Sequence, residues 1–214
     1  MATSKSIGSG EIHAAIERLA AAISERHEGE KNLLLLGIAN GGVELARRLT
    51  VSLLNGSPAA KSAKTSRPLA MAKSSEGGSH LTSPLHAVCG VVDISFHRDD
   101  IARHPIPKEF APTHIPADVD GAIVILVDDV LFSGRTVKAA LDELFDHGRP
   151  AKVELAVLVD RGNRLLPVAA DYTGLTLTAG PEERVVVTLD PKRPQLDVVS
   201  VLPKSRSPLA PRLS

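Results

Sequence analysis

The sequence predicts an α/β domain with an open, mainly parallel sheet flanked by helices and a small antiparallel edge or hood. Short apolar runs, typical of buried strands, alternate with amphipathic helical segments over most of the chain. Three further strand-like runs follow without helices between them, which predicts the antiparallel part. The length of 214 residues suits one domain, so we expect a single unit spanning residues 1–214.

The first strand–turn–helix unit occupies residues 33–54, after an amphipathic helix at 11–27. That helix places apolar side chains on one face at helical spacing. The run LLLLGI at 33–38 predicts a buried strand, because it is short, continuous and apolar. ANGG at 39–42 predicts a tight turn, and VELARRLTVSLL at 43–54 predicts the helix that follows it.

Two segments interrupt this alternation. Residues 55–86 are rich in Ser, Ala, Gly, Pro and Lys, with little to bury, which predicts a flexible insertion. Lys and Arg in it could touch RNA, although a solvated linker is the simpler interpretation. The prolines of 105–116 predict an exposed loop, and we expect a flexible C-terminal tail from about residue 203.

The second half of the chain supplies the remaining elements. Its apolar runs predict strands, and the helical spacing of TVKAALDELFDHG, closed by Gly148 and Pro150, predicts one helix. The expected helix is 136–148, and the expected strands are 88–101, 123–127, 152–160, 171–177, 185–189 and 196–202.

Composition excludes several classes of protein. Lys plus Arg and Asp plus Glu both number 25, so no overall charge favours nucleic acid or a membrane surface. Cys89 is the only cysteine, which excludes a disulfide framework and suits a reducing compartment. No stretch approaches the ~20 apolar residues of a membrane helix, and the N-terminus lacks an apolar signal segment. We expect a soluble cytoplasmic protein without a membrane partner.

The stretch VILVDDVLFSGRT, at 124–136, carries the strongest indication of chemistry. Asp128 and Asp129 come at the end of an expected strand, where open α/β sheets bind their ligands. Ser133, Gly134 and Thr136 come at the start of the next helix, a combination typical of a phosphate cradle. Carboxylates repel phosphate but accept hydrogen bonds from vicinal hydroxyls or bind a metal. A 5-phosphoribosyl group satisfies all of these features.

Other interpretations of this stretch fit less well. A Walker A loop requires G-x-x-x-x-G-K-[ST], which is not present here. A phosphoacceptor receiver domain also has acids at strand ends, but it does not need Ser-Gly-Arg-Thr directly after them. The simplest alternative is a capped helix with two solvated acids.

The same stretch resembles the 5-phosphoribosyl-1-pyrophosphate (PRPP) motif of type I phosphoribosyltransferases. Further stretches resemble, in order and spacing, the PyrR family of pyrimidine-operon regulators with uracil phosphoribosyltransferase activity. These are GIANGGVELARRL, VDISFHRDDI, DDVLFSGRTVKAALDEL, GRPAKVELAVLVDRGNRLLP and ADYTG. The resemblance covers nearly everything except 55–86 and the two tails, and it implies a type I phosphoribosyltransferase-like fold.

The resemblance implies that uracil and PRPP react to give UMP and pyrophosphate with Mg²⁺, and that the chain forms a homodimer or homotetramer. It assigns catalytic roles to Asp128, Asp129 and Arg98, and the two aspartates would also hold Mg²⁺, largely through PRPP or water. It assigns phosphate binding to Val130, Leu131, Phe132, Ser133, Gly134, Arg135 and Thr136. It assigns the pyrophosphate loop to Ala39, Asn40, Gly41 and Gly42, and the base to Asp160, Arg161, Tyr172 and Thr173, with Tyr172 stacking on the ring.

The chain departs from the family pattern at several positions. Asn40-Gly41-Gly42 replaces a common Thr-Arg-Gly, so an arginine that could meet a phosphate is missing. Asn163 and Ala169 replace a histidine and an arginine that RNA-binding members often carry, which disfavours RNA as a partner although Arg164 remains. Phe132 stands where some purine-specific relatives carry an acid, which favours a pyrimidine.

Three hypotheses follow. The first is a uracil phosphoribosyltransferase of PyrR type, which could also regulate pyrimidine genes. The second is an RNA-binding attenuator that senses UMP or UTP with weak or no catalysis. The third is a type I phosphoribosyltransferase for another base.

Asp93 is a further candidate for binding Mg²⁺, with a solvated turn as its alternative.

Overall fold

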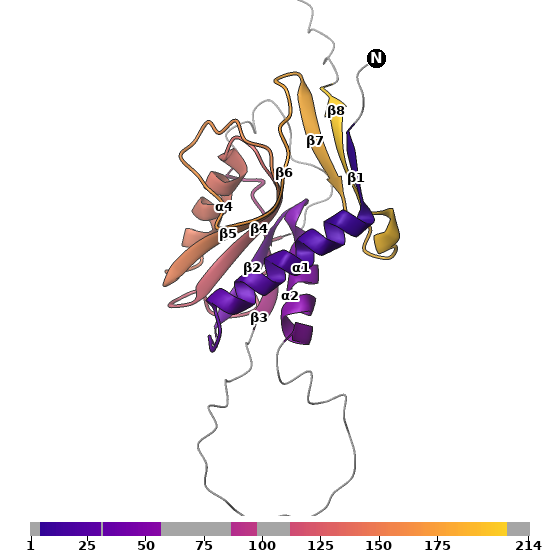
Figure 1. Cartoon of the computed structure of the whole chain (residues 1–214). Coiled ribbons are helices and arrows are strands. Elements are labelled where there is room, and N and C mark those ends of the chain that lie inside the picture. The colour runs from indigo at the N-terminus through magenta and orange to yellow at the C-terminus, as the bar shows by residue number, and fades with distance from the viewer. Residues whose placement is uncertain (1–4, 31, 57–86, 98–111, 205–214) are drawn as a thin grey trace, which may run out of the picture.

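The computed structural model of the chain describes residues 5–30, 32–56, 87–97 and 112–204 (Figure 1). Most of the expected insertion at 55–86, much of the expected loop at 105–116, the tail, and Arg98 lie outside the described residues. In the described part, no helix is long and apolar enough to cross a membrane.

The main sheet has five strands in the order β3-β2-β4-β5-β6, and every neighbouring pair is parallel. This confirms the predicted open, parallel sheet. The strands are β2 (Leu33–Ile38), β3 (Ala87–Val92), β4 (Ile123–Leu131), β5 (Lys152–Asp160) and β6 (Tyr172–Thr176). β4 is longer than the predicted 123–127, because pairing with β5 continues as far as Leu131 opposite Asp160. β3 is shorter than predicted and ends at Val92.

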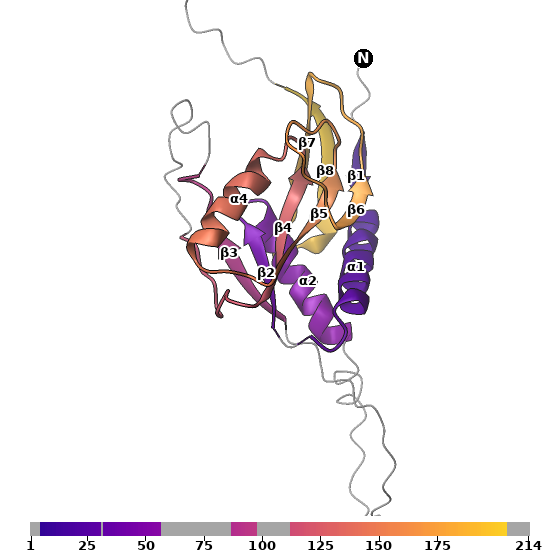
Figure 2. The ribbon, with the colours of Figure 1, turned by 90° about the vertical axis from the view of Figure 1, so that its left-hand side faces the viewer.

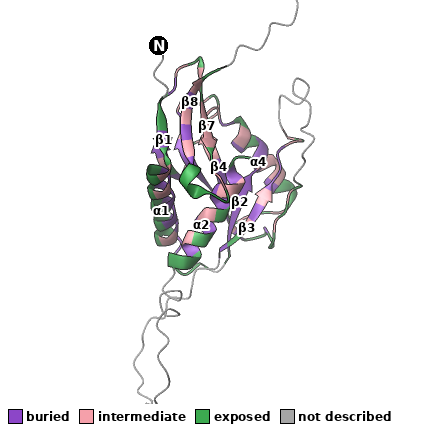
Figure 3. Cartoon of the chain, turned by 90° about the vertical axis from the view of Figure 1, so that its right-hand side faces the viewer, coloured by how far each residue is buried: buried purple, intermediate pink, exposed green. Residues whose placement is uncertain are grey.

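Helices cover both faces of this sheet (Figures 1 and 2). α1 (Ser9–Arg26) and α2 (Gly42–Gly56) pack on one face, and α4 (Arg135–Asp146) packs on the other. Alternate residues of β4 serve the two cores, because successive side chains of a strand point to opposite faces. Ile125 and Val127 join the α1–α2 core, and Val124 and Leu126 join the α4 core. The buried central strands and the exposed outer face of α1 are visible in Figure 3.

A second sheet of three antiparallel strands, here called the hood, forms the predicted antiparallel part. Its order is β1-β8-β7, with β1 (Ser6–Gly8), β7 (Glu183–Thr188) and β8 (Val198–Pro203). A short 3-10 helix, η1 (Pro194–Leu196), precedes β8. β1 was not predicted, since three residues are too few to show a strand pattern. The run expected at 171–177 became β6 at the edge of the main sheet instead of a hood strand.

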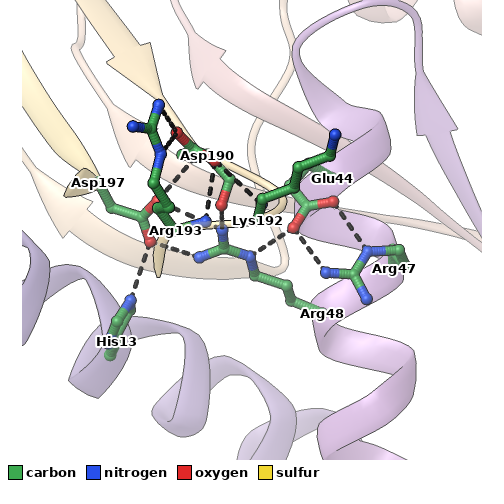
Figure 4. Close-up of polar contacts among 8 residues, drawn as sticks. All are labelled: His13, Glu44, Arg47, Arg48, Asp190, Lys192, Arg193 and Asp197. Atoms are coloured by element: carbon green, nitrogen blue, oxygen red, sulfur yellow. Dashed lines mark hydrogen bonds and ion pairs between the residues drawn. The ribbon is translucent and has the colours of Figure 1, made fainter. Parts of the chain in front are cut away.

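Arg48 of α2 fastens the hood to the helices (Figure 4). Its guanidinium bonds the buried carboxylate of Asp197 and the backbone carbonyl of Asp190 at 2.8 Å, both in the connection between β7 and β8. Its Nε donates to Glu44 at 2.7 Å within α2. His13 of α1 lies 2.9 Å from the Asp197 carboxylate. One carboxylate therefore joins the hood to both helices of this face.

The order of the strands creates a switch point between β2 and β4. From β2 the chain crosses through α2 to β3 on one side, whereas β4 lies on the other side of β2. Ligands of open α/β sheets bind beyond the carboxyl ends of the strands at such a point. The turn after β2 and the end of β4 meet there.

Candidate active site

Asp128 and Asp129 lie in the last part of β4, one buried and one half-buried. Asp128 is only 6% exposed, and its Oδ1 accepts a hydrogen bond from the Asp129 amide at 2.9 Å. Burial, reinforced by the neighbouring charge of Asp129, raises the pKa of Asp128 well above its ordinary value. Burial also raises the pKa of Asp129. Two carboxylates are thus held close together, one of them out of water, as a group of hydrogen-bond acceptors for a ligand.

The turn after β2 packs directly against the end of β4, including the Asp129 carboxylate. A Cβ atom at Gly41 would lie 2.5 Å from the Asp129 carboxylate, and one at Gly42 would lie 1.9 Å from the carbonyl oxygen of Val127. Only glycine permits this approach. The peptide bond between Ala39 and Asn40 is cis. The structure therefore brings the expected pyrophosphate loop, residues 39–42, to the expected ribose site.

The expected phosphate loop links β4 to α4. Val130 and Leu131 finish β4, and Phe132, Ser133 and Gly134 form the turn. Gly134 has a left-handed backbone with φ of 90°, which lets α4 begin at Arg135. The Arg135 amide donates to Ser133 Oγ at 3.3 Å. The N-terminus of α4, with Thr136 in its first turn, therefore lies beside the two carboxylates in the chain, as an anion site requires.

Asp160 ends β5 on the same edge of the sheet, next to the phosphate loop in space. It is paired with Leu131, and the amide of Arg161 donates to the Leu131 carbonyl at 3.0 Å. Burial favours a raised pKa at Asp160, but hydrogen bonds from Arg164 and from the Gly162 amide outweigh it and lower the pKa. The Arg164 Nη2 atom lies 2.6 Å from Asp160 Oδ2. Asp160 is therefore an ionised end to this strand.

Arg161 is buried, with 5% of its surface exposed. Its guanidinium lies over the ring of Phe132 at 4.0 Å from the centroid, and Nη2 donates to the Gly180 carbonyl at 2.9 Å. Its Nε has no hydrogen-bond partner. A buried donor without a partner is costly, so Arg161 could donate to a carbonyl oxygen of a ligand at this edge.

The segment after β6 lies against this edge and was not among the expected site residues. The Leu177 amide donates to the Asp160 carbonyl at 2.9 Å, and the Asn163 side chain donates to the Ala179 carbonyl at 3.4 Å. Residues 177–180 thus border the end of β5. The sequence Leu-Thr-Ala-Gly has no charged side chain and gave no signal of a site, and only the parallel pairing of β6 with β5 places it here.

Tyr172 and Thr173, which were predicted to cover the base, lie in the first part of β6. Tyr172 pairs with Ala156, near the start of β6 and four residues before Asp160, so it lies away from the carboxyl edge. Its ring is buried, and its hydroxyl donates to Glu154 at 2.8 Å. Thr173 pairs with Val157 at the same level of the sheet. The parallel register separates both residues from the carboxylate pair.

Asp93 follows β3 at the same carboxyl edge, and the Ala39 amide bonds the neighbouring Val92 carbonyl at 2.9 Å. Its Oδ1 accepts hydrogen bonds from Ser95, whereas its buried Oδ2 has no partner. Within the described residues, no group of three or more His, Cys, Asp or Glu side chains could hold a metal ion. A metal at the Asp128–Asp129 pair would therefore need most of its oxygen ligands from a substrate or water.

Comparison with known proteins identifies relatives over most of the chain. The phosphoribosyl transferase domain model matches residues 8–191. A relative named "Bifunctional protein PyrR" from Geobacter sp. (strain M21) is 38% identical over 192 residues, which cover 90% of this chain and 93% of the relative. The protein of the same name from Streptomyces coelicolor is 44% identical over 180 residues, 84% of this chain and 79% of the relative.

Solved structures of similar fold are more distant in sequence. The hypoxanthine phosphoribosyltransferase of Trypanosoma cruzi has a TM-score of 0.60 at 17% identity and covers 92% of this chain and 94% of that chain. A hypoxanthine-guanine phosphoribosyltransferase from Bacillus anthracis has a TM-score of 0.55 at 19% identity, with 84% of each chain covered. At these identities the structures support the fold and carry no information on the base.

Proposed function

Because this chain belongs to the phosphoribosyl transferase domain family and, within it, to the PyrR family, we propose that it transfers the 5-phosphoribosyl group of PRPP to uracil, giving UMP and pyrophosphate. One observation carries the proposal beyond membership. At the switch point between β2 and β4, Gly41 packs against the Asp129 carboxylate and Gly42 packs against the backbone of β4 at Val127. This arrangement offers carboxylates that can bind the ribose hydroxyls of PRPP. They lie between two turns, at 39–42 and 132–134, that can bind its pyrophosphate and its 5′-phosphate.

We assign one part of PRPP to each part of the site. The ribose hydroxyls donate to Asp128 and Asp129, and the 5′-phosphate binds Ser133–Thr136 at the start of α4. Pyrophosphate binds the backbone of residues 39–42. The departing pyrophosphate carries the developing negative charge, so preorganised amides there favour the transition state. Arg98 lies outside the described residues and stays a prediction.

Mg²⁺ fits this site as a partner of PRPP. Asp128 and Asp129 supply hard carboxylate oxygens, which Mg²⁺ prefers, and it commonly keeps waters and substrate phosphate oxygens as its other ligands. When bound, the ion supplies positive charge that stabilises the leaving pyrophosphate. The residues of the chain hold and orient the ribose.

Uracil is supported as the base by the surroundings of Phe132. This residue places an apolar ring, without an acid, after the carboxylate pair, and the ring stacks under Arg161. Uracil presents carbonyl oxygens, which can accept hydrogen bonds from the unpaired Nε of buried Arg161. The base edge is completed by Asp160 and by the backbone of residues 177–180.

RNA binding is the second candidate function, favoured by the name "Bifunctional protein PyrR" that the relatives carry. Asn163 and Ala169 weigh against it, because RNA affinity depends on basic side chains. Arg164 weighs against it too, since its guanidinium is engaged by Asp160 and backbone carbonyls. We propose a cytoplasmic homodimer or homotetramer whose main activity is the transfer reaction.

The decisive experiment incubates the purified protein with PRPP, Mg²⁺ and labelled uracil, hypoxanthine or orotate, and measures the nucleotide formed. We expect UMP from uracil alone. Asp129→Asn should abolish it, whereas Asp118→Asn, which changes an exposed aspartate, should not.

The other outcomes separate the alternatives. Product from hypoxanthine or orotate in place of uracil would overturn the choice of base. No product from any base, with UMP still bound, would show that the Asn40-Gly41-Gly42 turn does not support the chemistry, and the regulator hypothesis would then lead.

A further inference from the structure

Three successive backbone carbonyls of the phosphate loop are held by one short segment, residues 164–166. Arg164 Nη1 donates to the Leu131 carbonyl at 3.2 Å and to the Phe132 carbonyl at 3.0 Å. The amides of Leu165 and Leu166 both donate to the Ser133 carbonyl at 3.0 Å. The carbonyls of residues 131–133 are therefore all turned toward this segment.

Peptide geometry then decides where the loop amides point. In a planar trans peptide the carbonyl and the following N–H point in opposite directions. The amides of Phe132, Ser133 and Gly134 share their peptide planes with these three carbonyls, so they point away from residues 164–166. Among the hydrogen bonds of the described residues, none uses these three amides as donors. Successive free N–H groups at the start of a helix form an anion-binding concavity.

Arg164 is itself held in place from several directions. Its Nη2 bonds Asp160 Oδ2 at 2.6 Å, its Nη1 also donates to the Gly162 carbonyl at 3.2 Å, and its Nε donates to the Val168 carbonyl at 3.2 Å. Its side chain is 22% exposed. The planar guanidinium therefore joins the end of β5 to the turn after β4, and a lysine has too few fixed donors to reproduce this.

We propose that Arg164 is a positioning residue: it holds the carbonyls of residues 131 and 132 so that the amides of the phosphate loop face the 5′-phosphate. The inference deepens the proposed function, because it rests on the assignment of this loop to phosphate. It does not depend on which base is used. Arg164 touches no substrate in this role and acts through the backbone of the loop.

The test uses two ligands without a base, measured by isothermal titration calorimetry with the full-length protein. Ribose 5-phosphate reports on the phosphate loop, and pyrophosphate reports on residues 39–42. In Arg164→Gln we expect binding of ribose 5-phosphate to weaken by about tenfold or more, the loss typical of one charge-assisted hydrogen bond. Binding of pyrophosphate should not change.

The matched control is Arg149→Gln, because Arg149 also donates to a backbone carbonyl, that of Phe145 at 3.0 Å, but lies at the other end of α4. This control should bind both ligands like the parent protein. Arg164→Lys should fall between the parent and Arg164→Gln, and it serves as the test if Arg164→Gln does not fold.

Three results would overturn the inference. The first is unchanged binding of ribose 5-phosphate in Arg164→Gln and Arg164→Lys. The others are an equal weakening of ribose 5-phosphate and pyrophosphate binding in Arg164→Gln, or the same loss of ribose 5-phosphate binding in Arg149→Gln. Failure of the proposed function gives a different pattern. If uracil is not the substrate, the ribose 5-phosphate result stands. If the parent protein binds no ribose 5-phosphate, both proposals fail at the phosphate loop.

Discussion

At the scale of single residues, Asp128 and Asp129 are two adjacent carboxyl groups whose ionised forms are disfavoured by burial in the folded protein. Asp128 is 6% exposed and adjoins a second carboxylate whose pKa is also raised. Buried charge without a partner cation costs stability. A pair kept under these conditions suits a ligand that supplies hydroxyl donors or a metal.

Removing the charge of Asp128 should therefore stabilise the protein while abolishing catalysis. The folded-state pKa of Asp128 lies above the ordinary 3.8, so ionisation penalises the folded state increasingly as the pH rises through the raised pKa. Asp128→Asn should raise the Tm at pH 8 by about 2–4 °C for each kcal/mol relieved. The gain should disappear below about pH 3, where the carboxyl group is protonated in both the folded and the unfolded parent protein.

Thermal unfolding at several pH values, with a transferase assay, checks this prediction. Asp118→Asn is the control, because exposed Asp118 accepts a similar bond from the Asp120 amide at 3.0 Å. A lower Tm for Asp128→Asn at pH 8 would contradict the predicted cost of ionising Asp128 in the folded protein.

Gly41 and Gly42 should respond differently to alanine. A Cβ at Gly41 would displace the Asp129 carboxylate, which is a side-chain group and can move. A Cβ at Gly42 would meet the Val127 carbonyl, which the central strand holds. Gly41→Ala should thus lose most activity with little loss of stability. Gly42→Ala should lose about 2 kcal/mol or more of unfolding free energy, as overpacking does.

Urea unfolding and the transferase assay on both variants separate the two effects. Equal destabilisation of the two variants would show that the Asp129 side chain cannot move away from a Cβ atom at position 41. If Gly41→Ala kept full transferase activity, residues 39–42 would have no essential role in the reaction.

At the scale of elements, a buried carboxylate joins α1 to the edge of the main sheet. Glu154 of β5 is 2% exposed and lies 2.7 Å from Nε2 of His27, the C-cap of α1. It accepts a hydrogen bond from the Tyr172 hydroxyl of β6, and its Oε1 forms an ion pair with Lys152 Nζ at 2.5 Å. Tyr172 therefore stabilises the opposite end of the sheet from the active site.

The charge of Glu154 should contribute to stability over a defined pH range. Burial alone would raise the pKa of Glu154, but bonds from Lys152, Tyr172 and His27 outweigh it and lower the pKa to about 2. A lowered folded-state pKa gives stability that is present above the ordinary 4.5 and lost as the pH falls from there toward 2. Glu154→Gln should cost about 3 kcal/mol at pH 7, and progressively less below pH 4.5.

Urea denaturation of Glu154→Gln between pH 3 and pH 7 measures this dependence. Glu17→Gln is the control, because exposed Glu17 accepts one bond from Ser52 that glutamine can keep. A difference from the parent that is the same at every pH would assign the cost to packing and not to charge.

At the scale of the whole molecule, the sheets and helices of the described residues place the site on one edge. Arg48 and Asp197 fasten the hood to α1 and α2, and the parallel sheet brings the ends of β2, β4 and β5 together. In the described residues, α2 runs to Gly56 and β3 begins at Ala87, so residues 57–86 join these two elements.

Replacing residues 57–86 with a Gly-Ser linker of about ten residues, longer than a usual connection of this kind, should preserve transferase activity. The Tm should not fall, because a shorter connection has a lower entropy cost of closure. Activity and thermal unfolding of the deletion protein, beside a Gly-Ser replacement of the original length, provide the check. A folded but inactive deletion protein would show that this segment takes part in the reaction.

The sequence by itself determined the fold class and most of the elements, and it predicted the chemistry of the 124–136 stretch. The strands at 33–38 and 152–160 were predicted with their correct ends, because a continuous apolar run bounded by polar residues needs no distant contact to be recognised. The carboxylates and the phosphate loop are neighbours in the chain, so their joint use could be inferred from their order.

Only the tertiary structure decided which distant residues meet this stretch. It placed Gly41 against Asp129, Arg164 behind the phosphate loop, and residues 177–180 beside Asp160, and it paired Tyr172 with Ala156, four residues before the end of β5. The physical reason is that the register of parallel strands is set by packing on both faces of the sheet. A local pattern identifies a strand, but its level relative to a neighbouring strand depends on side chains far away in the sequence.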